Sequence, residues 1–203
     1  MKNRTRYIGI YLCIVFCGAL GFAVDTSKSY APYPQPDGGY VTDLAGLLTP
    51  GQEEQLESWI YTCEKRYGFE MAVVTIYSIQ DYPGTLNSSI KSFATGLFDA
   101  YGIGNMPKND GVLLLVAVKD RKARIELGAS YGRRRDSDAD RIMQRVIIPQ
   151  FKNDRYDKGI LNGTRAILKE FAGVRIIPGW TKLIVAAGIL VLIPVCISLF
   201  RSG

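Results

Sequence analysis

The stretch Gly111-Val-Leu-Leu-Leu-Val-Ala-Val118, with Lys122-Ala-Arg-Ile-Glu-Leu127 after it, determines the fold class. The first run contains no polar residue, which is typical of a strand buried on both faces of a sheet. In the second run apolar and charged residues alternate, which predicts a half-exposed strand. Only Lys119-Asp120-Arg121 separates the two runs, so we expect them to pair as a β-hairpin.

Working back toward the N-terminus, a helix is predicted from Thr49-Pro50-Gly51-Gln52, which combines a capping threonine, an early proline and a capping-box glutamine. Its apolar residues recur at helical spacing and Gly68 ends it. These apolar residues are Leu56, Trp59, Ile60, Cys63 and Tyr67. Residues 69–77 then predict a second buried strand, and the apolar face from Ile90 to Tyr101 predicts a second helix that ends at Gly102.

Two more helices are predicted after the hairpin. One runs from Asp138 to about Ile148 and is stopped by Pro149, and the other runs from Asp157 to Phe171. Helices that alternate with buried strands indicate an α/β fold, in which a small mixed β-sheet is flanked by helices on both faces.

Both ends of the chain are strongly apolar. Residues 1–24 have basic residues before an apolar run, which predicts a signal peptide or, because the run is long, a signal anchor. Residues 183–200 carry no charge, and Trp180 and Lys182 precede them, which predicts a transmembrane helix. Residues 25–40 are a Pro- and Gly-rich linker and 173–182 a juxtamembrane linker. We therefore expect the domain at 41–172 on the extracytoplasmic (periplasmic) side of the cell membrane.

Composition excludes several classes of function. Four of the 25 basic residues (Lys2, Arg4, Arg6 and Arg201) lie outside the middle of the chain, which leaves 21 basic against 19 acidic residues there. That balance argues against nucleic-acid binding. The chain has no histidine, which excludes Ser–His–Asp and Cys–His catalysis and His-ligated zinc. We expect no zinc, haem or nucleotide cofactor, and any metal should be an oxygen-bound Ca²⁺, Mg²⁺ or Mn²⁺.

Asp43 and Asp110 are the candidate metal ligands. Asp43 lies where the chain enters the domain, and Asp110 lies in an Asn-Asp-Gly turn before the central strand. If the fold brings the two loops together, two carboxylates and nearby carbonyl oxygens could bind Ca²⁺ or Mg²⁺. The alternative is that Asp110 only forms a turn and Asp43 only caps backbone N–H groups.

Arg133, Arg134 and Arg135 form a candidate anion site. They come just before a predicted helix, where they could bind a phosphate or a lipid headgroup with help from the helix amides. The alternative is a solvated loop in which the arginines pair with Asp136, Asp138 and Asp140.

A set of short motifs follows one another in a recognisable order. They are Val41-Thr-Asp43-Leu-Ala45-Gly46-Leu-Leu48-Thr-Pro50, Ala72-Val-Val-Thr75, Phe98-Asp-Ala-Tyr101-Gly102-Ile103-Gly104, Asn109-Asp110-Gly111-Val-Leu-Leu-Leu-Val116-Ala117, Asp120-Arg121-Lys122-Ala-Arg124-Ile125-Glu126-Leu-Gly128 and Ile147-Ile-Pro149-Gln-Phe151. Together they resemble the TPM domain over about residues 40–172.

The resemblance implies an exported, membrane-tethered α/β domain. Family members include thylakoid-lumen proteins of photosystem II repair, for which acid-phosphatase activity and calcium binding have been proposed, and a non-enzymatic accessory subunit of an animal acetylcholine receptor. Fold alone therefore does not fix the chemistry. Many members have a Gly-Tyr-Gly-Leu-Glu-Gly-like loop where this chain reads Gly128-Ala-Ser-Tyr-Gly-Arg-Arg-Arg-Asp136, and the glutamate of that loop is missing.

Two functions follow as hypotheses. The first is a binding, assembly or quality-control module for membrane-protein partners, which the absence of a complete nucleophile–base pair favours. The alternative is a divalent-metal-dependent acid phosphatase in which Asp43 and Asp110 bind the cation and an arginine of 133–135 binds the substrate phosphate. No individual catalytic residue is assigned under either hypothesis.

Overall fold

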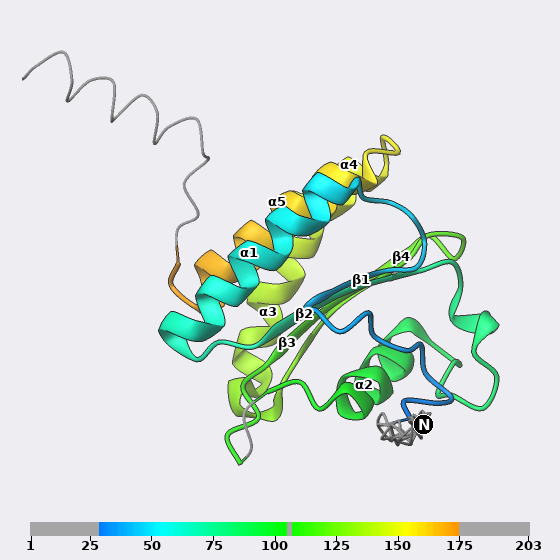
Figure 1. Ribbon diagram of the computed structural model, residues 1–203, viewed down its shortest axis with the longest axis horizontal. Coiled ribbons are helices and arrows are strands. Elements are labelled where there is room, and N and C mark those ends of the chain that lie inside the picture. Colours follow the sequence, from blue (N-terminus) through cyan, green and yellow to red (C-terminus); the bar gives the residue numbers. More distant parts are fainter. Residues whose placement is uncertain (1–28, 105–106, 175–203) are drawn as a thin grey trace, which may run out of the picture.

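The computed structural model describes residues 29–104 and 107–174, and within them the strands form a single mixed sheet (Figure 1). Its strands are β1 (Val41–Asp43), β2 (Met71–Ile76), β3 (Val112–Ala117) and β4 (Lys122–Leu127), in the spatial order β1-β2-β3-β4. Neighbours β1, β2 and β3 run parallel, and β4 runs antiparallel to β3. The predicted hairpin and the predicted mixed sheet are confirmed.

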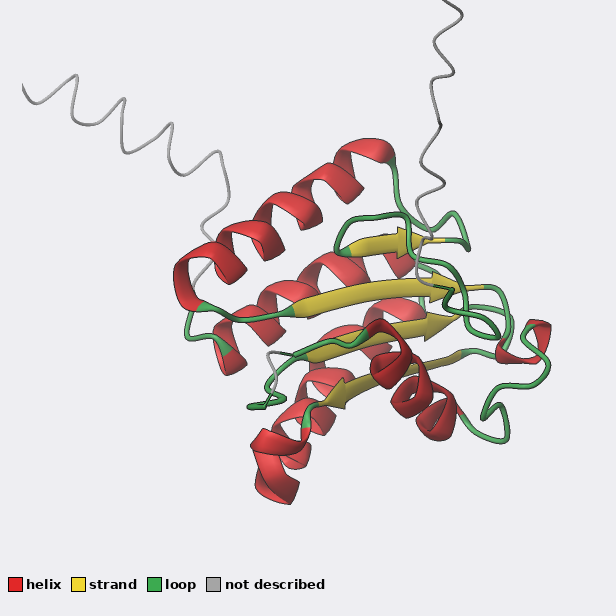
Figure 2. Ribbon diagram, turned by 60° about the horizontal axis from the view of Figure 1, so that its bottom comes forward, coloured by secondary structure: helices red, strands yellow, loops and turns green. Residues whose placement is uncertain are grey.

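Helices cover both faces of this sheet, as predicted (Figure 2). On one face lie α1 (Pro50–Tyr67), α3 (Gly132–Ile142) and α5 (Tyr156–Phe171), and on the other lies α2 (Ile90–Tyr101). Alternate residues of β3 divide between the two cores. Val112, Leu114 and Val116 pack with α1, α3 and α5, whereas Leu113, Leu115 and Ala117 pack with α2. Every residue of β3 is buried, which confirms the interpretation of its unbroken apolar run.

Helix α1 begins and ends where the sequence predicts. The Thr49 N–H donates to Gln52 Oε1 at 2.9 Å, which is half of a capping box, and Gly68 ends the helix at a φ of 65°. The predicted apolar stripe is wrong only at its last residue, Tyr67. Its side chain is 58% exposed because the helix runs past the edge of the core after Cys63.

Helix α2 has its predicted bounds, whereas the predicted bounds of the helix from Asp138 to about Ile148 are wrong at both ends. The helix α3 begins at Gly132, six residues before Asp138, because Arg135 joins its first turns to α5. It then continues through a π-helical segment (Met143–Ile147) into α4 (Ile148–Phe151). Pro149 follows this π segment directly and lies in the first turn of α4, and the chain remains helical through it.

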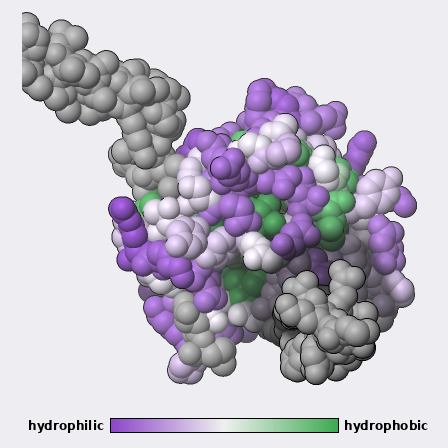
Figure 3. Space-filling model, in the orientation of Figure 1, coloured by the Kyte–Doolittle hydropathy of each residue, from purple (hydrophilic) through white to green (hydrophobic). Residues whose placement is uncertain are grey.

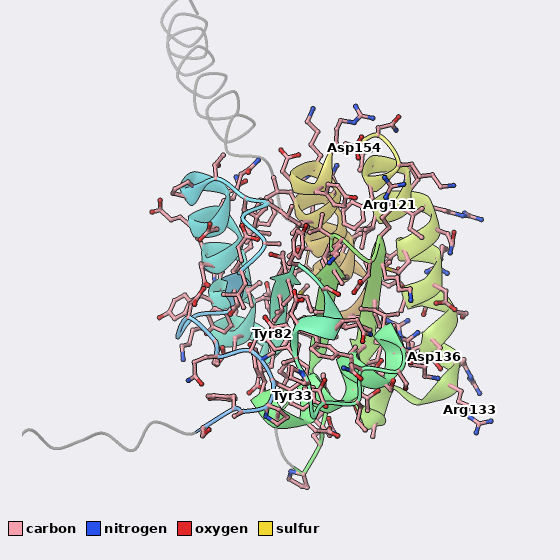
Figure 4. All side chains as sticks on the ribbon, turned by 90° about the vertical axis from the view of Figure 1, so that its right-hand side faces the viewer. Tyr33, Tyr82, Arg121, Arg133, Asp136 and Asp154 are labelled. Atoms are coloured by element: carbon pink, nitrogen blue, oxygen red, sulfur yellow. The ribbon has the colours of Figure 1, made fainter. Side chains whose placement is uncertain are left out.

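The residues just before the sheet lie against α2. Residues 29–40 contain no helix or strand, yet the Tyr33 ring packs edge-on against Phe93 at 5.3 Å between ring centroids. Tyr82 contacts Phe93 as well, at 5.7 Å, and Tyr33 and Tyr82 are labelled beside α2 in Figure 4. Tyr101 Oη donates to the Pro34 carbonyl at 3.1 Å. The packing of this Pro- and Gly-rich segment was not predicted from its composition.

The outer edge of β1 is closed by a side chain of α1. Tyr40 and Leu44 are joined to β2 by main-chain hydrogen bonds, so the intervening Val41 N–H points away from the sheet. Glu57 accepts from that N–H at 2.7 Å and from the Tyr40 N–H at 3.0 Å. An unpaired edge strand attracts other strands, and Glu57 occupies the donors of Tyr40 and Val41 at the start of this edge.

The predicted signal segment (1–24) and transmembrane helix (183–200) lie outside the described residues. Within 29–104 and 107–174, no helix combines the length and the apolar character that crossing a membrane requires. Much of the face seen in Figure 3 is hydrophilic, with small separate hydrophobic patches.

Candidate functional site

Asp43 is the last residue of β1 and shapes the loop that leads into α1. Its Oδ2 accepts from the Leu48 N–H at 2.8 Å, and its Oδ1 accepts from the hydroxyl of the buried Thr75 on β2. Both carboxylate oxygens are therefore engaged by protein donors. This geometry matches the capping role that the sequence left open for Asp43.

Asp110 lies at the opposite end of the sheet. Asp43 pairs with Thr75, which pairs with Val116 on β3, and Asp110 precedes Val116 by six residues of extended chain. At the rise of a β-strand this corresponds to about 20 Å. The structure does not bring the two aspartates together, so the two-carboxylate metal site expected from them is not formed. In the described part of the chain, no group of three or more Asp, Glu or Cys residues is placed to hold a metal ion.

Asp110 instead belongs to a loop cluster made of residues 108–111 and 128–135. Its carboxylate pairs with Lys108 at 2.6 Å, and its carbonyl accepts from Tyr131 Oη at 2.7 Å. Burial and the nearby Asp110 carboxylate raise the pKa of Tyr131 to about 12, so the phenol stays protonated and able to donate. Asn109 adopts a left-handed φ of 49°, and its carbonyl accepts from the Ser130 N–H at 3.2 Å.

The candidate anion site separates into two kinds of arginine. Arg135 donates to Asp138 Oδ2 at 2.7 Å and to the Glu170 carbonyl at 2.8 Å, and its guanidinium lies 4.7 Å from the centroid of the Phe171 ring. It therefore joins α3 to the end of α5. Arg133 and Arg134 are exposed in the first turn of α3, and Figure 4 shows Arg133 pointing outward near Asp136.

Arg135→Ala should lower the free energy of unfolding by about 1–2 kcal/mol, since it removes charge-assisted hydrogen bonds and a contact with an aromatic ring. Arg133→Ala is the matched control and should change it by less than about 0.5 kcal/mol. Urea denaturation of the full-length chain in a mild detergent measures both. Equal effects of the two substitutions would contradict the structural role of Arg135.

A cleft of about 490 Å³ lies beside the outer edge of β4. Its lining comes from the start of β4, from the first residue of α2 and from the region of the π segment, α4 and the start of α5. The lining residues are Ile90, Arg121, Lys122, Ala123, Met143, Ile148, Phe151, Lys152, Asp154 and Tyr156. The cleft therefore lies near the start of β4, which is the lowest strand in Figure 2.

The backbone around this cleft is unusual in three places. Arg121 and Asp154 have left-handed φ values of 51° and 54°, and the π segment contributes Met143 to the wall. Strained residues and π segments occur often at functional sites. Sequence reasoning missed this cleft, although the alternating pattern of 122–127 correctly indicated a half-exposed strand.

The domain is similar to a known family and to solved structures. A family model described as the TPM domain matches residues 41–170. The N-terminal domain of a protein from P. gingivalis, solved by solution NMR, is 31% identical with a TM-score of 0.54, and the match covers 65% of this chain and 83% of that one.

The N-terminal domain of the cg2496 protein from Corynebacterium glutamicum is 15% identical, with a TM-score of 0.50 and coverage of 68% and 84%. At that identity the likeness concerns the fold alone. No curated protein matches the chain.

Proposed function

Because this chain belongs to the TPM domain family, we propose that it is a membrane-tethered binding module on the extracytoplasmic side of the cell membrane. In this proposal the domain assembles with, or monitors, other membrane proteins and does no covalent chemistry. The apolar residues 183–200 would be the tether, and the basic residues before the first apolar run would keep that end of the chain inside.

One observation carries the proposal: the groups that chemistry would need are apart, whereas a surface suited to binding is in place. Asp43 and Asp110 lie at opposite ends of the sheet, and both oxygens of Asp43 already accept protein hydrogen bonds. The β4 cleft, in contrast, combines apolar walls with exposed cations at the start of β4. Pockets with apolar walls and a few polar groups are the usual form of a binding site.

Photo-cross-linking in intact cells tests this proposal. The photo-reactive residue p-benzoylphenylalanine replaces one exposed residue at a time in the full-length chain. The positions are Lys152 at the cleft, Arg133 at the loop cluster, and Tyr61 and Tyr67 on α1. A binding module should give discrete adducts with the same integral membrane proteins at some positions and not at others. If none of the positions gives an adduct in normally expressed protein, the module is excluded.

A divalent-metal-dependent acid phosphatase is the alternative function. What favours it is that Asp110 and the loop that leads to Arg133 and Arg134 lie in one cluster, joined through Tyr131. A phosphate could meet cations there, but Lys108 already pairs with the Asp110 carboxylate that would have to bind Ca²⁺.

Hydrolysis of p-nitrophenyl phosphate at acid pH, with and without Ca²⁺, distinguishes the alternative. We expect no more hydrolysis from the full-length chain than from its Asp110→Asn and Asp43→Asn variants. Hydrolysis that requires Ca²⁺ and is lost in Asp110→Asn, with Arg133→Ala weakening substrate binding, would replace the module by the phosphatase.

A further inference from the structure

We infer that the β4 cleft binds a short acidic segment of a partner protein, which inserts one aromatic side chain between the apolar walls. The inference rests on the proposed binding function and names the surface and the chemistry of the partner. Recognition is by the side chains of the cleft and not by the main chain of β4. Protein interfaces commonly depend on a few aromatic anchors that fill such pockets, with charged and polar groups at the rim.

The place of the cleft in the fold suits a binding site. Strand β3 ends at Ala117 and β4 begins at Lys122, so the cleft lies at the carboxyl end of the parallel strands. Ligands of open α/β sheets usually bind at this end. Arg121 and Asp154, which both line the cleft, are labelled at the same end of the domain in Figure 4.

The apolar walls specify the anchor side chain of the partner. Ala123, Ile148 and Phe151 pack against the core, yet each is only partly buried and also lines the cleft, together with the buried Met143. The ring centroids of Phe151 and Tyr156 are 4.8 Å apart, which provides an aromatic wall against which a further ring can pack. Because the side chain of Ala123 is small, the space beside these rings suits an aromatic side chain.

The charges at the rim specify the residues beside the anchor. Arg121, Lys122 and Lys152 are exposed at the cleft, and within the described chain none of them lies within ion-pair distance of a carboxylate. Asp154 is the acidic member of the lining, so cations are in excess. The cations come from two separate walls, because Lys122 begins β4 and Lys152 follows α4. Exposed cations on both sides of an apolar pocket suit a segment with acidic residues on both sides of its anchor.

Two further carboxylates at this end of the sheet are engaged by the protein itself. Asp120 accepts two hydrogen bonds at 2.8 Å from the loop after β2, and Asp157 accepts one at 3.0 Å from Gln52 on α1. Tyr156, in contrast, is the first residue of α5, and among the described residues no side chain caps that helix end. The first amides of α5 therefore add a positive partial charge beside the cleft.

A synthetic peptide with the sequence Glu-Asp-Trp-Asp-Glu, blocked at both ends and labelled with a dye, is the probe. Binding to the full-length chain in detergent is measured by fluorescence anisotropy, and we expect it to be saturable. A peptide with the amides Gln and Asn in place of the acids, and one with alanine in place of tryptophan, should each bind at least 10-fold more weakly. If indole-3-propionate, with one ring and one carboxylate, binds as tightly as the peptide, the cleft takes a small anion and the inference is overturned.

Photo-cross-linking locates the anchor without any change to the protein. The photo-reactive residue p-benzoylphenylalanine replaces the tryptophan of the peptide, and mass spectrometry maps the adducts after irradiation. We expect adducts within residues 143–156, which supply most of the apolar wall. Adducts found only elsewhere on the domain would overturn the cleft as the docking surface.

Protein variants test the same surface. Lys122→Glu with Lys152→Glu should weaken binding of the acidic peptide at least 10-fold and give measurable binding of a peptide with lysine at the acidic positions. The matched control, Lys65→Glu with Lys169→Glu on α1 and α5, should do neither. Ala123→Leu fills the apolar space and should weaken binding at least 10-fold while the unfolding midpoint stays within a few degrees.

The outcomes separate this inference from the proposed function. Acidic-peptide binding that survives both Ala123→Leu and the charge reversal at Lys122 and Lys152 overturns the inference. Absence of peptide binding also overturns it, while cross-links to membrane proteins from Arg133 in intact cells would still support a binding module. Absence of cellular cross-links at every position overturns the module itself, whatever the peptide does.

Discussion

Gly128→Ala should destabilise the domain by about 3 kcal/mol, a large fraction of the stability of an ordinary domain. A Cβ at this position would lie 2.2 Å from the Asn109 carbonyl oxygen and 2.7 Å from Asn109 Oδ1. The backbone of Gly128 has a φ of −62° and a ψ of 157°, which alanine adopts without strain, so the effect comes from close approach.

The neighbouring chain cannot easily move away from the new methyl group. The Asn109 carbonyl accepts from the Ser130 N–H, and the Gly128 N–H donates to the Gly111 carbonyl, so the two loops are joined on both sides of the contact. Urea denaturation of the full-length chain, followed by circular dichroism, measures the loss.

Gly51→Ala is the matched control. Gly51 lies in the first turn of α1 with no atom within 4 Å of the added Cβ, so alanine should stabilise the domain by up to about 1 kcal/mol through helix propensity. A loss at Gly128 no larger than about 1 kcal/mol would contradict the close packing of the loop cluster.

Glu57→Ala should destabilise the domain by about 2–3 kcal/mol. The substitution removes the acceptor of the Tyr40 and Val41 N–H groups, and Val41 is 5% exposed, so water reaches its N–H poorly. Glu54→Ala, an exposed glutamate on the same helix, should change the stability by less than about 0.5 kcal/mol.

The same substitution should also alter self-association. With Glu57 gone, β1 presents unpaired donors at the edge of the sheet, and size-exclusion chromatography should show dimers or larger species that the Glu54→Ala variant does not form. A Glu57→Ala protein that remains as stable and as monomeric as the control would mean that Glu57 does not close the edge.

Much of the fold could be predicted because buried apolar residues recur along the sequence with the period of the helix or strand that contains them. The unbroken run of β3, the alternation of β4 and the capped, apolar-striped α1 each follow from residues that are neighbours in the chain. Helix α3 could not be bounded in this way. Its start depends on Arg135 contacting Glu170, which is 35 residues away, and on the π segment that carries the helix past Met143.

The candidate site was predicted less well for a related reason. Asp43 and Asp110 are plausible ligands by residue type, but which ends of the sheet they occupy depends on strand order and register. The cleft depends on residues from α2, β4 and α4 that meet only after folding, and the left-handed backbone of Arg121 and Asp154 leaves no mark in residue type. Arg135 shows the reverse case, since a residue typical of anion sites serves an interhelical contact.

The π segment between α3 and α4 affects how the β4 cleft should vary among related proteins. A π turn corresponds to one residue inserted into an α-helix, and each residue of an α-helix turns the chain by about 100°. Deleting one residue between Met143 and Ile147 would rotate Ile148 and Phe151 by that angle relative to α3, away from the cleft they line. A single-codon insertion or deletion is therefore enough to create or erase the apolar wall, and relatives that lack this residue should have lost the cleft while keeping the fold.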